Sequence, residues 1–195
     1  MSMENKKKGL LIIFSGPSGV GKGTVRELFF DREELNLAYS ISMTTRKPRE
    51  GEVDGRDYYF VSRERFEEAI ANDELLEYAE FVGNYYGTLK SEVERLRNQG
   101  KNVLLEIEVQ GALQVIDKVP DSLSVFLVPP SMEELERRIV NRRTEAAEVI
   151  KERLDKAAKE MELMRHYRYV ICNEDPQIAA DMVALIIKRN IETTL

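Results

Sequence analysis

The sequence has one cysteine, no long apolar segment and no excess of basic residues. Its single cysteine, Cys172, excludes an internal disulfide and favours a reducing compartment, so we expect a cytoplasmic protein. No apolar run approaches the ~20 residues of a membrane-spanning helix, and the first eight residues lack the apolar core of a signal peptide. Acidic residues outnumber basic ones by 35 to 29, which argues against nucleic acid or an anionic membrane as the main partner.

The 195 residues suffice to bury a substantial core and are typical of one domain. Apolar strand-like runs alternate with helical patterns, which predicts an α/β fold with a parallel sheet. The predicted strands cover about 10–14, 37–43, 58–61, 75–82, 102–109, 123–128 and 169–172. The predicted helices cover about 21–30, 63–71, 89–98, 112–116, 132–141, 146–166 and the segment that follows Asp175.

A β-rich stretch within residues 37–88 interrupts this alternation, so we expect it to form an insert on one side of the core. Residues 85–88 are expected to lead from a turn at Gly83 and Asn84 into the next helix. The predicted domain spans 1–195, with a core at about 9–41, 89–132 and 157–195, an insert at about 42–88 and a lid at about 133–156.

The clearest motif lies between a short apolar run that ends at Phe14 and a helical pattern that begins near Lys22. The order of strand, glycine-rich loop and helix is the one that a phosphate-binding P-loop requires. A glycine-rich turn without a ligand is the alternative, but three glycines followed by a lysine favour the P-loop. The predicted triphosphate-binding residues are Gly16, Pro17, Ser18, Gly19, Val20, Gly21, Lys22, Gly23 and Thr24.

One position departs from the P-loop pattern. Gly23 stands where Ser or Thr usually binds Mg²⁺, and a hydroxyl group follows one residue later at Thr24. We therefore expect Mg²⁺ to be held mainly through water and substrate phosphates. Glu106 and Glu108 alternate with apolar residues of a predicted strand, so we expect both on one side near the sheet's carboxyl edge. One of them, Glu106, could hold Mg²⁺ through water, and the other could face the acceptor nucleotide.

The predicted insert carries groups that suit a second phosphate. Arg46 and Arg49 flank a proline, and two guanidinium groups that converge can each bind a phosphate bidentately. Tyr58 and Tyr86 add phenol donors, and Glu77 can accept two hydrogen bonds from a base such as guanine. The alternatives are two solvated arginines, half-buried core tyrosines and a glutamate on the solvent face of a strand.

Residues 133–156 contain five arginines among acidic residues. Most such runs are solvated helix faces with ion pairs. Phosphoryl transfer, however, needs positive charge around the migrating group and exclusion of water, which a helical cover over the P-loop would supply. Arg138 and Arg142 lie four residues apart and therefore share one helix face.

Five segments, taken in chain order, resemble the guanylate kinase family. They are Gly16–Lys22, Ser42–Arg49, Gly51–Tyr58, Gly83–Thr88 and Glu106–Gly111. The match extends from about residue 9 to about residue 175. The resemblance implies a P-loop NTPase three-layer fold with a β-rich GMP-binding insert and a helical lid. It also implies Mg²⁺-dependent transfer of the γ-phosphoryl group of ATP to GMP or dGMP.

The resemblance further implies roles for individual residues. The acceptor phosphate would be held by Arg46, Arg49, Tyr58 and Tyr86, and guanine would be read by Ser42, Glu77, Thr88 and Glu108. Four basic residues would bind the transferred phosphoryl group, and they are Lys22, Arg138, Arg142 and Arg153. Asn173 would lie near the donor adenine. The chain departs from the family pattern at Gly23, and at Glu106 and Glu108, where many members carry aspartate.

Two other functions fit parts of the pattern. A guanylate-kinase-like binding module would use the GMP site for a phosphorylated peptide, but such modules lose the P-loop, which is intact here. Another monophosphate kinase is the second alternative, because Gly21–Thr24 also resembles adenylate kinase; the insert argues against it. We expect direct in-line transfer without a covalent intermediate, so His166 and Cys172 would take no part.

Overall fold

The computed structural model describes residues 7–81, 83–140 and 147–193; residues 1–6, 82, 141–146 and 194–195 lie outside this description. A five-stranded sheet with the order β2-β7-β1-β8-β9 forms the centre, and its neighbouring strands are all parallel. Its strands are β1 (Leu11–Ser15), β2 (Leu37–Tyr39), β7 (Asn102–Glu106), β8 (Leu123–Val128) and β9 (Tyr169–Cys172). The predicted parallel α/β sheet is therefore confirmed.

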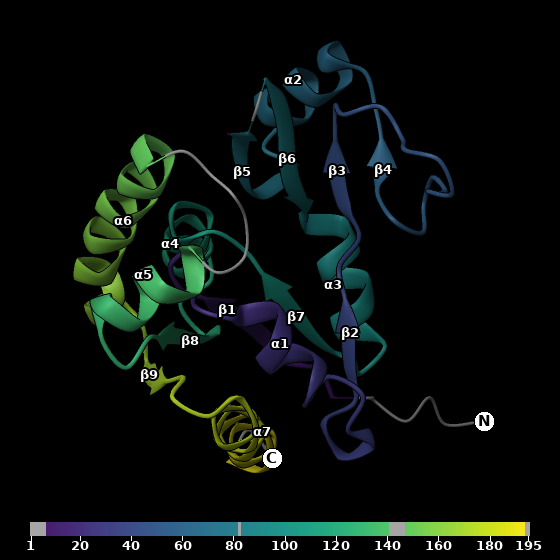
Figure 1. Ribbon diagram of the computed structural model, residues 1–195. Coiled ribbons are helices and arrows are strands. Elements are labelled where there is room, and N and C mark those ends of the chain that lie inside the picture. The colour runs from purple at the N-terminus through teal and green to yellow at the C-terminus, as the bar shows by residue number, and fades with distance from the viewer. Residues whose placement is uncertain (1–6, 82, 141–146, 194–195) are drawn as a thin grey trace.

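Side chains of β1 alternate between two hydrophobic cores, because successive strand residues point to opposite faces of a sheet. The surrounding helices are α1 (Lys22–Glu27), α3 (Lys90–Asn98), α4 (Val109–Lys118) and α7 (Pro176–Thr193), and two 3₁₀ turns span Glu33–Leu35 and Glu162–His166. Ile12 and Phe14 pack with α1 and α7, whereas Leu11 and Ile13 pack with α3 and α4. The arrangement is a three-layer sandwich of helix, sheet and helix (Figure 1).

A second, four-stranded sheet lies to one side of the central sheet (Figure 1). Its strands are β3 (Ser42–Thr44), β4 (Tyr59–Phe60), β5 (Leu75–Phe81) and β6 (Asn84–Leu89), in the order β4-β3-β6-β5. Helix α2 (Arg63–Ala71) covers it through a small core that contains Phe66. The predicted helix boundary is confirmed, because Ser62 Oγ accepts a hydrogen bond from Arg65 N at 3.2 Å.

Three predictions of local structure were wrong. The predicted strand 37–43 is divided, since β2 joins the central sheet and β3 joins the second sheet. Residues 85–88 belong to strand β6, which pairs with both β3 and β5. The predicted strand 102–109 ends at Glu106, and Glu108 is the N-cap residue of α4. The apolar pattern of a segment does not reveal where its strands begin and end, because these limits depend on partner strands that are distant in the sequence.

Two further helices, α5 (Met132–Val140) and α6 (Ala147–Met161), pack against each other through Leu135, Ile139 and Ala157. They lie on the side of the central sheet away from the second sheet (Figure 1). Arg142 falls between these helices, outside the described residues. Within the ranges that the structure covers, no helix has both the length and the apolar character needed to cross a membrane.

Candidate functional site

The loop between β1 and α1 has the backbone of an anion-binding turn. Gly19 and Gly21 have φ values of 85° and 100°, a region that favours glycine. A Cβ atom on Gly19 would lie 2.7 Å from Ile139 Cγ1, and one on Gly21 would lie 2.7 Å from Asn173 Nδ2. Both conformation and space therefore require glycine, and α1 begins directly after the loop with its N–H groups directed toward the turn.

Lys22 folds back over this loop. Its Nζ donates hydrogen bonds to the carbonyl oxygens of Gly16 at 2.7 Å and Pro17 at 3.3 Å. Burial lowers the pKa of the Lys22 ammonium below its ordinary value, although Glu108 and Glu106 act in the opposite direction. A partly desolvated cation is thus held at the turn, where a phosphate would meet a strong field.

A cavity of about 370 Å³ opens above the loop. It is lined by Ser18, Gly19, Gly21, Lys22, Gly23, Thr24, Glu27, Glu106 and Glu108. Gly23 borders open space, since no atom lies within 4 Å of an added Cβ. Of the predicted loop residues, Gly16, Pro17 and Val20 are buried instead of lining the cavity.

Two of the predicted arginines reach the loop from α5 and α6. Arg138 donates to the carbonyl oxygens of Val20 at 3.3 Å and Asn173 at 2.9 Å, and its Nε donates to Glu134 at 2.7 Å. Arg153 Nη2 donates to Ser18 Oγ at 3.1 Å. The two helices therefore bring positive charge beside the P-loop.

Asn173 lies beneath the loop. The residue is 2% exposed, and its Nδ2 donates to the carbonyl oxygen of Val20 at 2.8 Å. The residue follows β9 and supports the turn from behind, close to Gly21. Its expected contact with adenine stays a prediction.

A second cavity of about 390 Å³ lies between the two sheets. Residues from both sheets line it, and they are Arg26, Tyr39, Ser40, Ile41, Ser42, Arg56, Asp57, Tyr58, Thr88, Leu104, Leu105, Glu106 and Ile107. Three of the residues expected to contact the acceptor, Ser42, Tyr58 and Thr88, are among them. Glu106 lines both cavities, so the two spaces adjoin at this residue.

Arg46, Tyr58 and Tyr86, which are expected to bind the acceptor phosphate, lie together in the second sheet and its loop. The Arg46 guanidinium lies 5.3 Å from the centre of the Tyr58 ring, and the rings of Tyr58 and Tyr86 are 6.1 Å apart. Arg46 also binds both carboxylate oxygens of Glu52, at 2.8 and 2.9 Å. Arg46 is thus held in a fixed orientation, whereas Arg49 is exposed.

Sequence reasoning did not identify Glu52 or Arg26. Glu52 shares one Pro- and Gly-containing loop with the two arginines, and that spacing is the signal that could have revealed it. Arg26 stands four residues after Lys22, one helical turn away, and its Nε lies 3.4 Å from Glu106 Oε2. This ion pair orients the carboxylate that borders both cavities.

Glu77 does not lie on the solvent face of its strand. The residue is 6% exposed, and one carboxylate oxygen accepts a 2.6 Å hydrogen bond from Thr88 Oγ1. Gly111 makes room for the other oxygen, because a Cβ there would lie 2.6 Å from Glu77 Oε2. Burial raises the pKa of the Glu77 carboxyl above its ordinary value, although Thr88 and Lys118 act in the opposite direction.

The two glutamates near the carboxyl edge of the sheet have different partners. Glu106 pairs with Arg26, and Glu108 Oε2 lies 3.1 Å from Lys156 Nζ on α6. In the part of the chain that the structure describes, no three His, Cys, Asp or Glu side chains form a metal-binding group. Thr24, Glu106 and Glu108 nevertheless offer oxygen atoms to one cavity, which fits a Mg²⁺ ion that keeps water and phosphate ligands.

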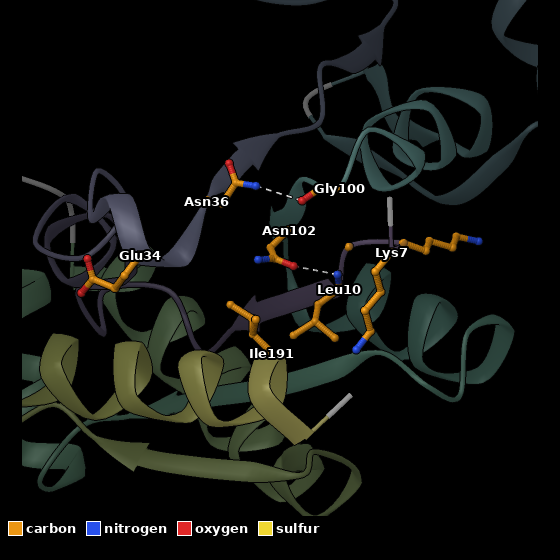
Figure 2. A pocket seen from close by; sticks show the side chains of 9 residues that line it. Lys7, Leu10, Glu34, Asn36, Gly100, Asn102 and Ile191 are labelled. Carbon is orange, nitrogen blue, oxygen red and sulfur yellow. Dashed lines mark hydrogen bonds between the residues drawn. The ribbon is translucent and has the colours of Figure 1, made fainter. Parts of the chain in front are cut away.

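A third cavity, of about 240 Å³, lies at the opposite edge of the central sheet. Figure 2 shows that two of its polar residues bond to the protein itself: Asn102 Oδ1 accepts from Leu10 N at 2.8 Å, and Asn36 Nδ2 donates to Gly100 O at 2.9 Å. Leu10 precedes β1 and Asn102 begins β7, so this cavity faces the amino ends of the strands. Ligands of open α/β sheets bind at the carboxyl ends, where the other two cavities lie.

Comparisons with known proteins agree with this geometry. A family model described as guanylate kinase matches residues 8–190. A guanylate kinase from Lactococcus lactis subsp. lactis (strain IL1403) is 58% identical over 183 residues, which are 94% of this chain and 89% of that protein. A guanylate kinase from Bacillus anthracis is 55% identical over 181 residues, with 93% of this chain and 88% of that protein covered.

Solved structures show the same likeness. The crystal structure of guanylate kinase from Anaplasma phagocytophilum matches with a TM-score of 0.68 and 36% identity, covering 94% of this chain and 87% of that one. The SH3-kinase fragment of tight junction protein 3 matches with a TM-score of 0.50 and 11% identity, covering 96% of this chain and 60% of that one. The second match concerns the fold alone.

Proposed function

The chain belongs to the guanylate kinase family, and we propose that its P-loop cavity binds the ATP donor while the cavity between the two sheets binds the GMP acceptor. The protein is an ATP:GMP phosphotransferase that phosphorylates GMP to GDP. The observation that carries the assignment of the cavities is that they adjoin at Glu106, since transfer between two nucleotides requires neighbouring sites.

On the donor side, the N–H groups of the loop and the start of α1 would bind the β- and γ-phosphates. Lys22 would add its charge after exchanging the carbonyl oxygens of Gly16 and Pro17 for phosphate oxygens. Arg138 and Arg153 would neutralise charge on the transferred group, a role that their contacts with Val20 O and Ser18 Oγ support. Arg142 stays a candidate for the same role.

On the acceptor side, Arg46, Arg49, Tyr58 and Tyr86 would hold the phosphate of GMP or dGMP. Glu77 would accept hydrogen bonds from the N1–H and 2-amino groups of guanine, with Ser42, Thr88 and Glu108 completing the base site. Adenine lacks both donors, so it would leave a buried carboxylate without partners. The burial of Glu77 supports this basis for specificity.

The reaction would be a direct in-line transfer from the γ-phosphate of ATP to a phosphate oxygen of GMP. No nucleophilic side chain is required, because positioning and charge neutralisation supply most of the rate enhancement. Mg²⁺, held by substrate phosphates and water near Thr24 and Glu106, would neutralise phosphate charge. Residues 42–88 and 133–156 would close around the substrates and exclude water.

The proposed assignments can be tested with one coupled assay of ADP release. GMP and dGMP should be phosphorylated, whereas AMP, UMP and CMP should react slowly, and activity should require Mg²⁺. A lack of ADP release with all of these acceptors would favour a binding module instead. That alternative is less compatible with the P-loop geometry around Gly21 and Lys22.

A further inference from the structure

In the loop that joins β3 to β4, Glu52 is the carboxylate that binds both predicted phosphate-binding arginines, Arg46 and Arg49. Its Oε1 accepts from Arg46 Nη2 at 2.8 Å, and its Oε2 accepts from Arg46 Nη1 at 2.9 Å. The same Oε2 accepts from the backbone N–H of Arg49 at 2.7 Å. These contacts lower the pKa of the Glu52 carboxyl to about 2, so the group is ionised at neutral pH.

The contact with Glu52 uses only one edge of the Arg46 guanidinium group. A guanidinium group carries five N–H donors in a planar fork. Nη1 donates to Glu52 and also to the carbonyl oxygen of Lys47 at 2.8 Å, and Nη2 gives one hydrogen to Glu52. The second Nη2 hydrogen and the Nε hydrogen form the other edge of the fork, which suits a bidentate contact with a phosphate. The side chain of Tyr86, also assigned to the acceptor phosphate, hydrogen-bonds Arg46 as well.

We propose that Glu52 is a positioning residue for the acceptor phosphate. It binds the edge of Arg46 formed by Nη1 and Nη2 and the backbone N–H of Arg49, so that the edge formed by Nε and Nη2 faces the phosphate of GMP. This inference rests on the proposed function of Arg46 and Arg49. Glu52 acts through these two residues and does not itself touch the phosphate.

The opposite role would be competition, in which Glu52 occupies the position of the phosphate and must leave before GMP binds. The geometry argues against it for two reasons. Glu52 binds the edge of Arg46 formed by Nη1 and Nη2 and does not bind Nε. The Arg49 N–H fixes the carboxylate to the loop independently of Arg46, so GMP need not displace it.

The test compares Glu52→Gln with Glu50→Gln, since Glu50 lies in the same loop and is exposed. Glutamine keeps the size of the side chain but turns one acceptor oxygen into a donor that faces Arg46 or Arg49. We expect Glu52→Gln to raise the KM for GMP about 10-fold, because charge-assisted bonds that orient the arginine are lost. The KM for ATP should stay within about twofold, as should every constant of Glu50→Gln.

Two further measurements separate positioning from a general loss of structure. Calorimetric binding of guanosine, which lacks the phosphate, should be the same in Glu52→Gln and the wild-type protein. Glu52→Ala should also weaken GMP binding without altering guanosine binding, and circular dichroism verifies the fold of both variants.

The outcomes distinguish the inference from the proposed function. A wild-type protein that does not phosphorylate GMP would overturn the proposed function itself. Wild-type activity together with an unchanged KM for GMP in Glu52→Gln would overturn the positioning role alone. A lower KM for GMP would show that Glu52 competes with the phosphate, and would also overturn the inference.

Discussion

Thr88 Oγ1 donates a 2.6 Å hydrogen bond to Glu77 Oε1 across the paired strands β5 and β6. The bond holds a buried carboxylate in one orientation, with its second oxygen beside Gly111 at the start of α4. Burying a charge without a full set of partners costs free energy, which a binding site can recover when the ligand supplies the missing donors. The pair therefore has the properties expected of a site that reads hydrogen-bond donors.

Replacing Glu77 with glutamine should impair the reaction strongly. The amide keeps the shape but weakens two charge-assisted hydrogen bonds of roughly 1.5–3 kcal/mol each, so kcat/KM for GMP should fall about 100-fold or more. Steady-state kinetics with GMP and AMP measure both activity and discrimination. Glu80→Gln is the matched control, because Glu80 lies on the same strand and is exposed. Unchanged GMP kinetics in Glu77→Gln would remove the proposed role.

The same substitution should make stability less dependent on pH. Burial raises the pKa of Glu77 above its ordinary value of 4.5, so the folded state holds its proton more tightly than the unfolded state. The stability that this proton provides is fully present below the ordinary pKa and is lost as pH rises through the raised pKa. Thermal unfolding between acidic and neutral pH should thus show Glu77→Gln gaining on the wild-type protein as pH increases. A Glu77→Gln variant that loses stability relative to the wild-type protein as pH rises would contradict this sign.

Gly21 and Gly23 should respond differently to substitution. Gly21→Ala should destabilise the protein by about 1–2 kcal/mol from its positive φ alone, and it should raise the KM for ATP because Asn173 must move. Gly23→Ser meets open space and adds a hydroxyl where the P-loop pattern has one, so less Mg²⁺ should be needed for half-maximal activity. Denaturant unfolding and Mg²⁺ titration measure the two effects. A higher Mg²⁺ requirement in Gly23→Ser would count against the proposed metal position.

Arg138 and Arg137 offer a matched pair of adjacent arginines. Both bind Glu134, but Arg138 also bonds the carbonyl oxygens of Val20 and Asn173, whereas the Arg137 side chain is 68% exposed. Arg138→Gln should lower kcat roughly 1000-fold, the scale of an arginine that stabilises a transferring phosphoryl group. Arg137→Gln should leave kcat within about twofold, as expected of a solvated ion pair. Equal losses in the two variants would argue that Arg138 has no special role.

Local segments of the fold could be predicted well. The strand from Leu123 to Val128, the strand from Tyr169 to Cys172 and the helix capped by Ser62 have the predicted boundaries. Each depends on signals within a few residues, such as an apolar run or a capping side chain. The divided segment 37–43 was missed, because its two halves pair with different sheets and their apolar pattern is continuous.

The candidate site also contains residues that the sequence alone identified and relationships that only the tertiary structure revealed. Gly16 to Thr24 could be recognised from the sequence alone, since strand, loop, lysine and helix are consecutive and their backbone geometry is local. Only the tertiary structure decided that Arg153 reaches Ser18, that Gly111 makes room for Glu77 and that Glu106 borders two cavities. Arg153 and Ser18, for example, lie 135 positions apart in the sequence. The periodicity of one segment specifies which face it buries, but not which distant residue packs against that face.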